Sequence, residues 1–170
     1  MKEHIQTLAR YNRWANRRLY AAVADARAGM GDAVFTRPMG AFFGSLCGTL
    51  NHILVADQVW LRRITGTGPQ PPALDTILHP TFPALQTARE AEDERLIATV
   101  AGLDAAALEG TLHYHSFAGA PQQNRLSDVL THMANHQTHH RGQAHTLLSQ
   151  LGREAPVLDL IYFLRTEQAG

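Results

Sequence analysis

Histidines are concentrated in one stretch near the C-terminal end of the chain, residues 126–151 (LSDVLTHMANHQTHHRGQAHTLLSQL). Apolar residues recur there at three- and four-residue steps, which predicts an amphipathic helix. His140 falls in the middle of the apolar stripe, and His136 lies one turn earlier, near its edge. Two imidazoles one turn apart can share a metal ion. The pair therefore indicates a metal site, and the alternative is two neutral core histidines with hydrogen-bond partners.

A third candidate ligand, His52, lies in a second apolar stretch, residues 42–64 (FFGSLCGTLNHILVADQVWLRRI). The spacing predicts a helix that is apolar nearly all round, as expected of an element that packs on more than one side. His52 falls off its main stripe, on a second face. If that face meets the histidine-rich helix, His52 supplies a third ligand; otherwise it is a half-buried histidine with a backbone partner. The residues alone leave both interpretations open.

Other side chains are candidates for a supporting role. Asp57 stands inside the main stripe of the 42–64 helix, either as a paired buried carboxylate or as a group that orients a ligand through a hydrogen bond. The charged run REAEDER (89–95) is typical of a solvated face. Glu92 falls near the apolar stripe, however, so it could point into the bundle. His132 or Asp57 could also serve as a fourth metal ligand.

Residues 111–117 (TLHYHSF) alternate in polarity ahead of the histidine-rich helix, which predicts a short hairpin. His113 and His115 would point the same way along its first strand. They form an alternative metal pair, although an exposed edge strand is the more usual setting for such residues.

The other segments supply the remaining scaffold. Helical spacing recurs in residues 5–23 and 85–103, a connector rich in proline and glycine occupies 65–80, and a last short helix is expected over 157–164. We therefore expect a single all-α domain over residues 1–170. Its architecture is a four-helix bundle with a short hairpin or loop before the last long helix and a short C-terminal helix.

Two well-known metal chemistries of helical proteins are missing from this pattern. A carboxylate-bridged di-iron site needs Glu-x-x-His pairs, which the histidine-rich helix lacks. The zinc peptidase signature needs a glutamate directly after the first histidine, where this chain has Gln137. A mononuclear three-histidine site remains.

The overall composition excludes several classes of partner. Lys plus Arg equals Asp plus Glu at 15 each, and the isoelectric point is near 7.2, which argues against nucleic-acid and membrane binding. Cys47 is the only cysteine, so no internal disulfide forms. The N-terminus lacks the apolar core of a signal peptide, and no segment approaches the roughly 20 apolar residues of a membrane span. We expect a soluble, cytoplasmic protein.

Several motifs follow one another along nearly the whole chain: YNRWANRRL at 11–19, LNHILVADQVWLRR at 50–63, HxxxH with RGQ at 136–143, and LG with VLDLIYFL at 151–164. In order and spacing they resemble the DinB-like (DinB/YfiT) family of metal-binding four-helix bundles. The resemblance implies a left-handed bundle in up-down-down-up order, commonly a homodimer. It also implies a divalent metal held by His52, His136 and His140.

Three neutral imidazoles suit zinc, nickel, iron(II) or copper better than magnesium or calcium, and they leave at least one coordination position open. We expect one divalent transition metal, with zinc or nickel ahead of iron or manganese. Such a metal lowers the pKa of a bound water or thiol and polarises a neighbouring electrophile. A metal bound in this way could therefore support either hydrolysis or thiol transfer.

Some members of the resembled family look like thiol-dependent transferases that use bacillithiol, mycothiol or glutathione. The leading hypothesis is therefore a metal-dependent thiol S-transferase acting on an electrophilic small molecule, with no catalytic side chain assigned. The alternatives are a metal-dependent hydrolase and a non-catalytic, stress-response module that binds a metal or small molecule. A purely structural metal is disfavoured, because structural zinc takes four protein ligands.

Overall fold

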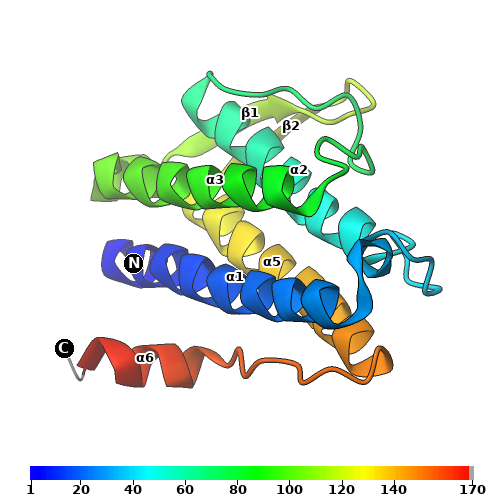
Figure 1. Cartoon of the computed structure of the whole chain (residues 1–170). Helices are drawn as coiled ribbons and strands as arrows, with labels where there is room; N and C mark the ends of the chain where they lie inside the picture. The colour runs from blue at the N-terminus through cyan, green and yellow to red at the C-terminus, as the bar shows by residue number, and fades with distance from the viewer. Residues whose placement is uncertain (169–170) are drawn as a thin grey trace.

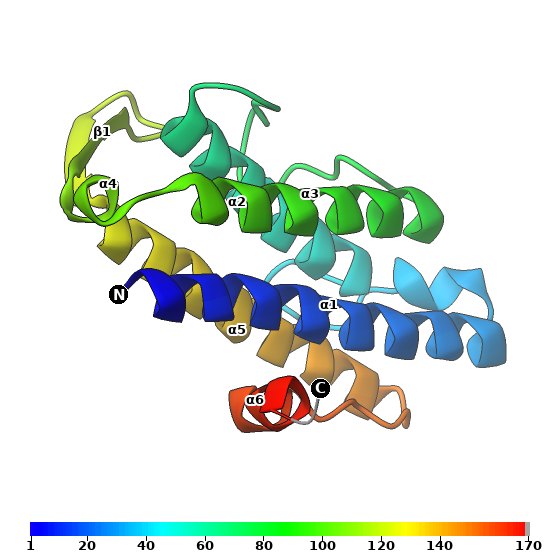
Figure 2. The ribbon, with the colours of Figure 1, turned by 90° about the vertical axis from the view of Figure 1, so that its left-hand side faces the viewer.

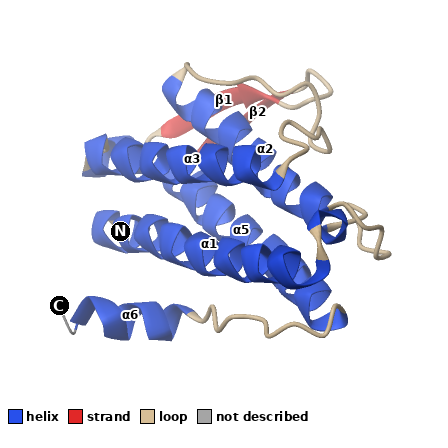
Figure 3. Cartoon of the chain, viewed as in Figure 1, coloured by secondary structure: helices blue, strands red, loops and turns tan. Residues whose placement is uncertain are grey.

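The computed structural model describes residues 1–168 and is mostly helical (Figure 1, Figure 3). The long helices are α1 (Lys2–Met30), α2 (Leu46–Thr65), α3 (Phe82–Gly102) and α5 (Leu126–Gln150). The short elements are the 3-10 helix η1 (Asp32–Phe35), α4 (Ala105–Glu109), β1 (Thr111–His115), β2 (Pro121–Arg125) and α6 (Leu160–Gln168). The predicted helical bundle, hairpin and C-terminal helix are confirmed. No helix in the described range is long and apolar enough to cross a membrane.

The four long helices run in up-down-down-up order. Followed from blue to orange in Figure 1, α1 and α5 run in one direction and α2 and α3 in the other. α1 and α2 each pack against both α3 and α5, so they stand diagonally across the bundle. Figure 2 shows α6 outside the bundle, where it packs beside α1. Because α2 and α5 share an interface, histidines from both helices can reach a common site.

A polar layer divides the apolar core at the middle of the bundle. The cluster at one end includes Leu19, Val23, Leu50, Leu54, Leu85, Leu147 and Leu148. The cluster at the other end includes Ile5, Ala9, Leu61, Leu96, Val100, Leu130 and Met133. Between them, each helix contributes buried polar side chains, which are Asn12, Asn16, Asp57, Arg89, Asp93, Gln137 and Arg141.

The centre of this layer is a buried ion-pair network. The Arg89 guanidinium lies 2.7 Å from Asp57 Oδ2 and 3.1 Å from Asp93 Oδ1, and none of these three residues is more than 2% exposed. Gln137 donates to the same Asp57 oxygen, and Asn16 donates to Asp93 Oδ1 at 2.9 Å. An unpaired charge is costly to bury. The network therefore favours the one register in which all four helices bring these partners together.

Arg141 extends the layer toward α1. Its guanidinium donates to Gln137 Oε1 at 2.8 Å and to Asn12 Oδ1 at 3.1 Å, and it lies 5.1 Å from the centre of the Tyr11 ring. Tyr11 in turn donates to the Leu158 carbonyl at 2.7 Å, which fixes the chain ahead of α6. The layer thus connects the bundle to its C-terminal segment.

Two helix boundaries differ from the sequence prediction. Residues 42–45 lie outside α2, because Gly44 has a positive φ of 78° and Ser45 caps the helix by accepting a hydrogen bond from the Gly48 N–H. The last helix begins at Leu160 instead of residue 157. A serine followed by two apolar residues was the signal that could have placed the start of α2 correctly.

The charged run 89–95 was wrongly predicted to be a solvated face. Arg89 and Asp93, one turn apart, both point into the polar layer. Glu92 is also buried, as its place near the apolar stripe had indicated, and Arg95 lies 2.8 Å from its carboxylate. The run carries four acidic residues between two arginines, which resembles a surface pattern. The sequence did not show that Arg89 would pair with a carboxylate on α2.

Replacing Arg89 with methionine should lower the free energy of unfolding by about 3–5 kcal/mol at pH 8, because Asp57 and Asp93 remain buried without their cation. In the wild-type protein burial raises the pKa of Asp57 to about 6, against the opposing charge of Arg89. Losing Arg89 moves this pKa further above the value of 3.8 in an unfolded chain. The variant therefore loses stability as the pH rises through that window, which urea unfolding at pH 5 and pH 8 measures.

Arg17→Met is the matched control, since Arg17 is exposed and pairs with Glu94 at the surface. Its effect should stay within about 0.5 kcal/mol at both pH values. Similar losses in the two variants, or a loss in Arg89→Met that does not change with pH, would contradict the role given to the network.

Candidate metal centre

The structure brings the three predicted ligands together at the α2–α5 interface. His52 comes from α2, and His136 and His140 come from successive turns of α5. One ring nitrogen of each lies within 4.8 Å of the others, and the Nε2 atoms of His52 and His136 are 3.1 Å apart. The question left open by the sequence is answered: the second face of α2 meets the histidine-rich helix. These three histidines could hold a metal ion.

Two of the three imidazoles are held in place by a hydrogen bond at Nδ1, the ring nitrogen that points away from the cluster. His52 Nδ1 lies 2.8 Å from the Leu74 carbonyl oxygen, and His140 Nδ1 lies 2.9 Å from Gln143 Oε1. A carbonyl oxygen only accepts hydrogen bonds, so each Nδ1 carries the proton and each Nε2 keeps a lone pair. Metal-binding histidines are characteristically held in this way. Both lone pairs are thus available in the space between the rings.

The surroundings keep the three imidazoles neutral. Burial lowers the pKa of His136 to about 3, with a further contribution from the neighbouring His140 and His52. Burial also lowers the pKa of His52 and of His140. Neutral imidazole is the form that binds a metal ion. The site therefore requires no deprotonation before it can accept a metal at neutral pH.

Phe43 covers one side of the site, and the sequence did not predict this role. Its ring stacks on His52 with 3.8 Å between centroids and an interplanar angle of 18°, and it meets His140 edge-on at 5.5 Å. The sequence placed Phe43 inside a helix, where it would have pointed along α2. Because the chain turns at Gly44 before α2 begins, Phe43 folds back over the histidines.

Neither candidate for a fourth ligand joins the group. Asp57 is committed to Arg89 and Gln137, which bears out its interpretation as a paired buried carboxylate. It influences the site only indirectly, because Gln137 follows His136 on α5. The His132 ring lies 5.8 Å from the His136 ring and packs against Trp60. Within residues 1–168, the cluster that could hold a metal contains three side chains, and such a set leaves coordination positions free.

The remaining candidates lie elsewhere. Glu92 is paired with Arg95 on α3. His113 and His115 occupy exposed positions of β1, as expected of an edge strand, and are not part of the three-histidine cluster. No third ligand accompanies that pair among the described residues.

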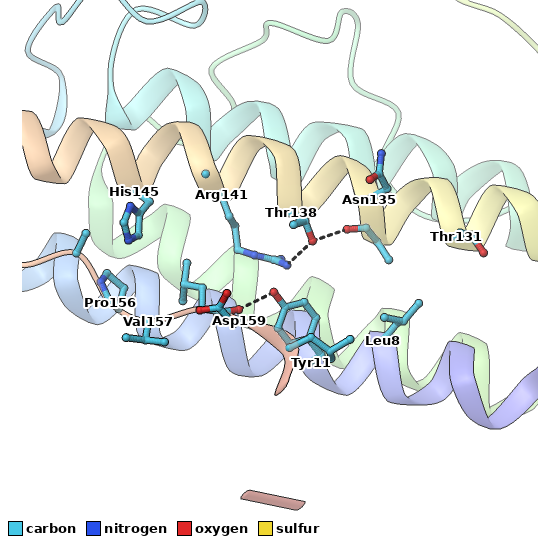
Figure 4. A pocket seen from close by; sticks show the side chains of 15 residues that line it. Leu8, Tyr11, Thr131, Asn135, Thr138, Arg141, His145, Pro156, Val157 and Asp159 are labelled. Atoms are coloured by element: carbon cyan, nitrogen blue, oxygen red, sulfur yellow. Dashed lines mark hydrogen bonds between the residues drawn. The ribbon is translucent and has the colours of Figure 1, made fainter. Parts of the chain in front are cut away.

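A separate cavity lies on another side of α5. It has a volume of about 730 Å³ and lies between α5, the start of α1 and the segment 155–160 (Figure 4). Arg141 and Tyr11 reach it, and so do Thr138 and His145. At 100° per residue, Thr138 and His145 face away from His136 on the helix. This cavity is therefore separate from the histidine cluster.

Replacing Gln143 with leucine should weaken zinc binding by about 10–100-fold, because His140 would lose the acceptor that fixes its Nδ1 proton. Competition with a chelating indicator gives the dissociation constant. Gln150→Leu, at the exposed end of α5, is the control and should bind zinc like the wild type. Equal affinities of the two variants would show that Gln143 does not position His140.

Comparison with known proteins agrees with this fold. Protein DinB of Bacillus subtilis (strain 168) is 24% identical, over 99% of this chain and 100% of that protein. A crystal structure of a DinB-like protein from Bacillus cereus ATCC 10987 matches with a TM-score of 0.60 and 18% identity, over 83% of this chain and 91% of that one. A family model described as the DinB family matches residues 1–170. The resemblance of the sequence motifs is confirmed, and the chain belongs to the DinB family.

Proposed function

We propose that this protein is a metal-dependent thiol S-transferase that joins a low-molecular-weight thiol to an electrophilic small molecule. The observation that supports it most is the set of three converging, neutral imidazoles without a fourth protein ligand among the described residues. A structural zinc site is normally closed by four ligands, whereas a reactive site keeps a position open.

The donor set fits zinc or nickel best. Imidazole nitrogens suit these metals and iron, whereas manganese prefers oxygen ligands. Bound there, the metal would lower the pKa of a thiol, so that the thiolate, which is the nucleophilic form, is present at neutral pH. The chain's own contribution is to hold His52 and His140 through Leu74 and Gln143, and to cover one side of the site with Phe43.

The proposed transfer is a nucleophilic substitution at carbon. The thiol sulfur loses its proton and forms a bond to the electrophilic carbon, while the bond from that carbon to its leaving group breaks with the electron pair. The proton passes to solvent or to the leaving group.

Hydrolysis is the second candidate, because the same open position would bind water and lower its pKa. The two reactions differ in one requirement that an assay can test. A transferase is silent without an added thiol, whereas a hydrolase turns over its substrate with water alone.

Zinc- or nickel-loaded protein should form a thioether from 1-chloro-2,4-dinitrobenzene and at least one of a panel of thiols that includes glutathione, cysteine and 2-mercaptoethanol. Absorbance of the conjugate measures the rate. His140→Ala should reduce the rate at least about 100-fold, since a ligand is lost. His145→Ala, on another face of α5, should behave like the wild type. Silence with every thiol would overturn the transferase, and turnover of ester or amide substrates without thiol would favour the hydrolase.

A further inference from the structure

A row of aromatic rings leads from the histidine cluster to the hairpin. The His132 ring lies 5.8 Å from that of His136, and Trp60 lies 5.5 Å beyond His132. The Tyr114 ring of β1 follows at 5.1 Å from Trp60. A hollow of about 280 Å³ runs along His132, Trp60 and Tyr114. Asn124, Asp128 and Val129 line the same hollow. The row therefore places a line of ring faces between the metal centre and the hairpin, along which an extended molecule can lie.

The row ends at an arginine pair on the last turn of α2. The Arg63 guanidinium lies 4.5 Å from the centre of the Trp60 ring and 4.7 Å from that of Tyr114. Arg62 and Arg63 both line a second hollow, of about 610 Å³, between the end of α2 and β1. Tyr114 lines both hollows. None of the described residues that line the second hollow is acidic, and His113 and His115 add further nitrogen donors.

Both arginines lack a carboxylate partner in the described part of the chain. Arg62 donates to the Gly68 carbonyl at 2.7 Å and Arg63 to the His115 carbonyl at 2.9 Å, and neither forms an ion pair there. Burial lowers the pKa of Arg63, so its charge is poorly solvated where it stands. A planar, half-buried guanidinium without a counter-ion is suited to a carboxylate, which it can bind through two parallel hydrogen bonds.

The distance from the histidines sets the size of the ligand. Arg63 follows His52 by eleven residues on α2, which is roughly 16 Å of helix rise and within about 20° of the same face. Three extended residues span about 10 Å. With the reach of both side chains added, a molecule of about tripeptide length joins the two positions.

We infer that the thiol used by the three-histidine site is a peptide-sized molecule with a carboxylate, which binds Arg63 and Arg62 while its sulfur reaches His52, His136 and His140. That the bound molecule is a thiol rests on the proposed function. That its far end is a carboxylate rests on Arg63, which stacks on Trp60 and Tyr114. We call the two hollows together the binding groove. His113 and His115 thereby belong to this groove, where they line the second hollow, instead of to a second metal site.

Binding of S-methylglutathione to the full-length protein tests the inference. This probe carries two carboxylates, and its capped sulfur cannot form a thiolate. Calorimetry should show binding to the wild type that weakens as salt increases. Arg63→Met should weaken binding by about tenfold or more, and Arg63→Lys should retain part of the affinity because the charge remains.

Arg18→Met is the matched control. Arg18 also lies over a tryptophan ring, at 4.9 Å from Trp14, and also donates to a backbone carbonyl, that of Val157, but it lies on α1 outside the groove. Its affinity should equal that of the wild type. Thermal unfolding checks that each variant is folded, and Arg62→Met replaces Arg63→Met if the latter is not. No binding by the wild type, or equal binding by the Arg18 and groove variants, would overturn the inference.

Kinetics separates this inference from the proposed function. In Arg63→Met, KM for glutathione should rise by about tenfold. KM for 2-mercaptoethanol, which has no carboxylate, should stay the same. An unchanged KM for glutathione would overturn the groove and leave the transferase standing. Silence with every thiol would overturn the transferase, whereas the loss of S-methylglutathione binding in Arg63→Met would still establish the carboxylate site.

Discussion

The buried ion pairs of Arg89 with Asp57 and Asp93 are the interaction on which the rest of the structure depends. Apolar side chains can find alternative apolar neighbours after a helix shifts, whereas a displaced charge in the core loses its partner. Gln137 donates to Asp57 and thereby fixes α5 against α2 at the level of the histidines. The register that satisfies the polar layer is the same register that places His136 opposite His52. Stability and site geometry therefore have one origin.

The site itself combines two opposing demands. A metal centre needs free lone pairs, and a protein interior disfavours polar atoms without partners. The structure meets both by giving His52 and His140 a hydrogen-bond acceptor on the outer nitrogen and leaving the inner nitrogen free. Burial keeps the rings neutral, so they neither repel one another nor repel a cation. The exposed imidazoles and aromatic rings beyond this cluster provide the surface on which a substrate can extend.

Much of this arrangement could be predicted from the sequence, and the parts that could not have physical reasons. The spacing of His136 and His140 on an apolar stripe predicted their shared direction, because helical periodicity is a local property. The meeting of His52 with them depends on which faces of two helices pack together, and the residues alone left that open. Phe43 was predicted to lie in a helix, but Gly44 and the capping Ser45 make that helix begin only at Leu46. The hydrogen bond of His52 to the Leu74 carbonyl could not be predicted either, because every residue has a backbone carbonyl.

The most direct test of the account is the metal content of the protein, measured by elemental analysis after purification without an affinity tag or added metal. The wild type should contain about one equivalent of a divalent transition metal, His140→Ala should contain essentially none, and His145→Ala should match the wild type. Absence of metal from the wild type, even after loading with zinc or nickel, would contradict the central claim. His52, His136 and His140 would then be core histidines that the polar layer happens to bring together.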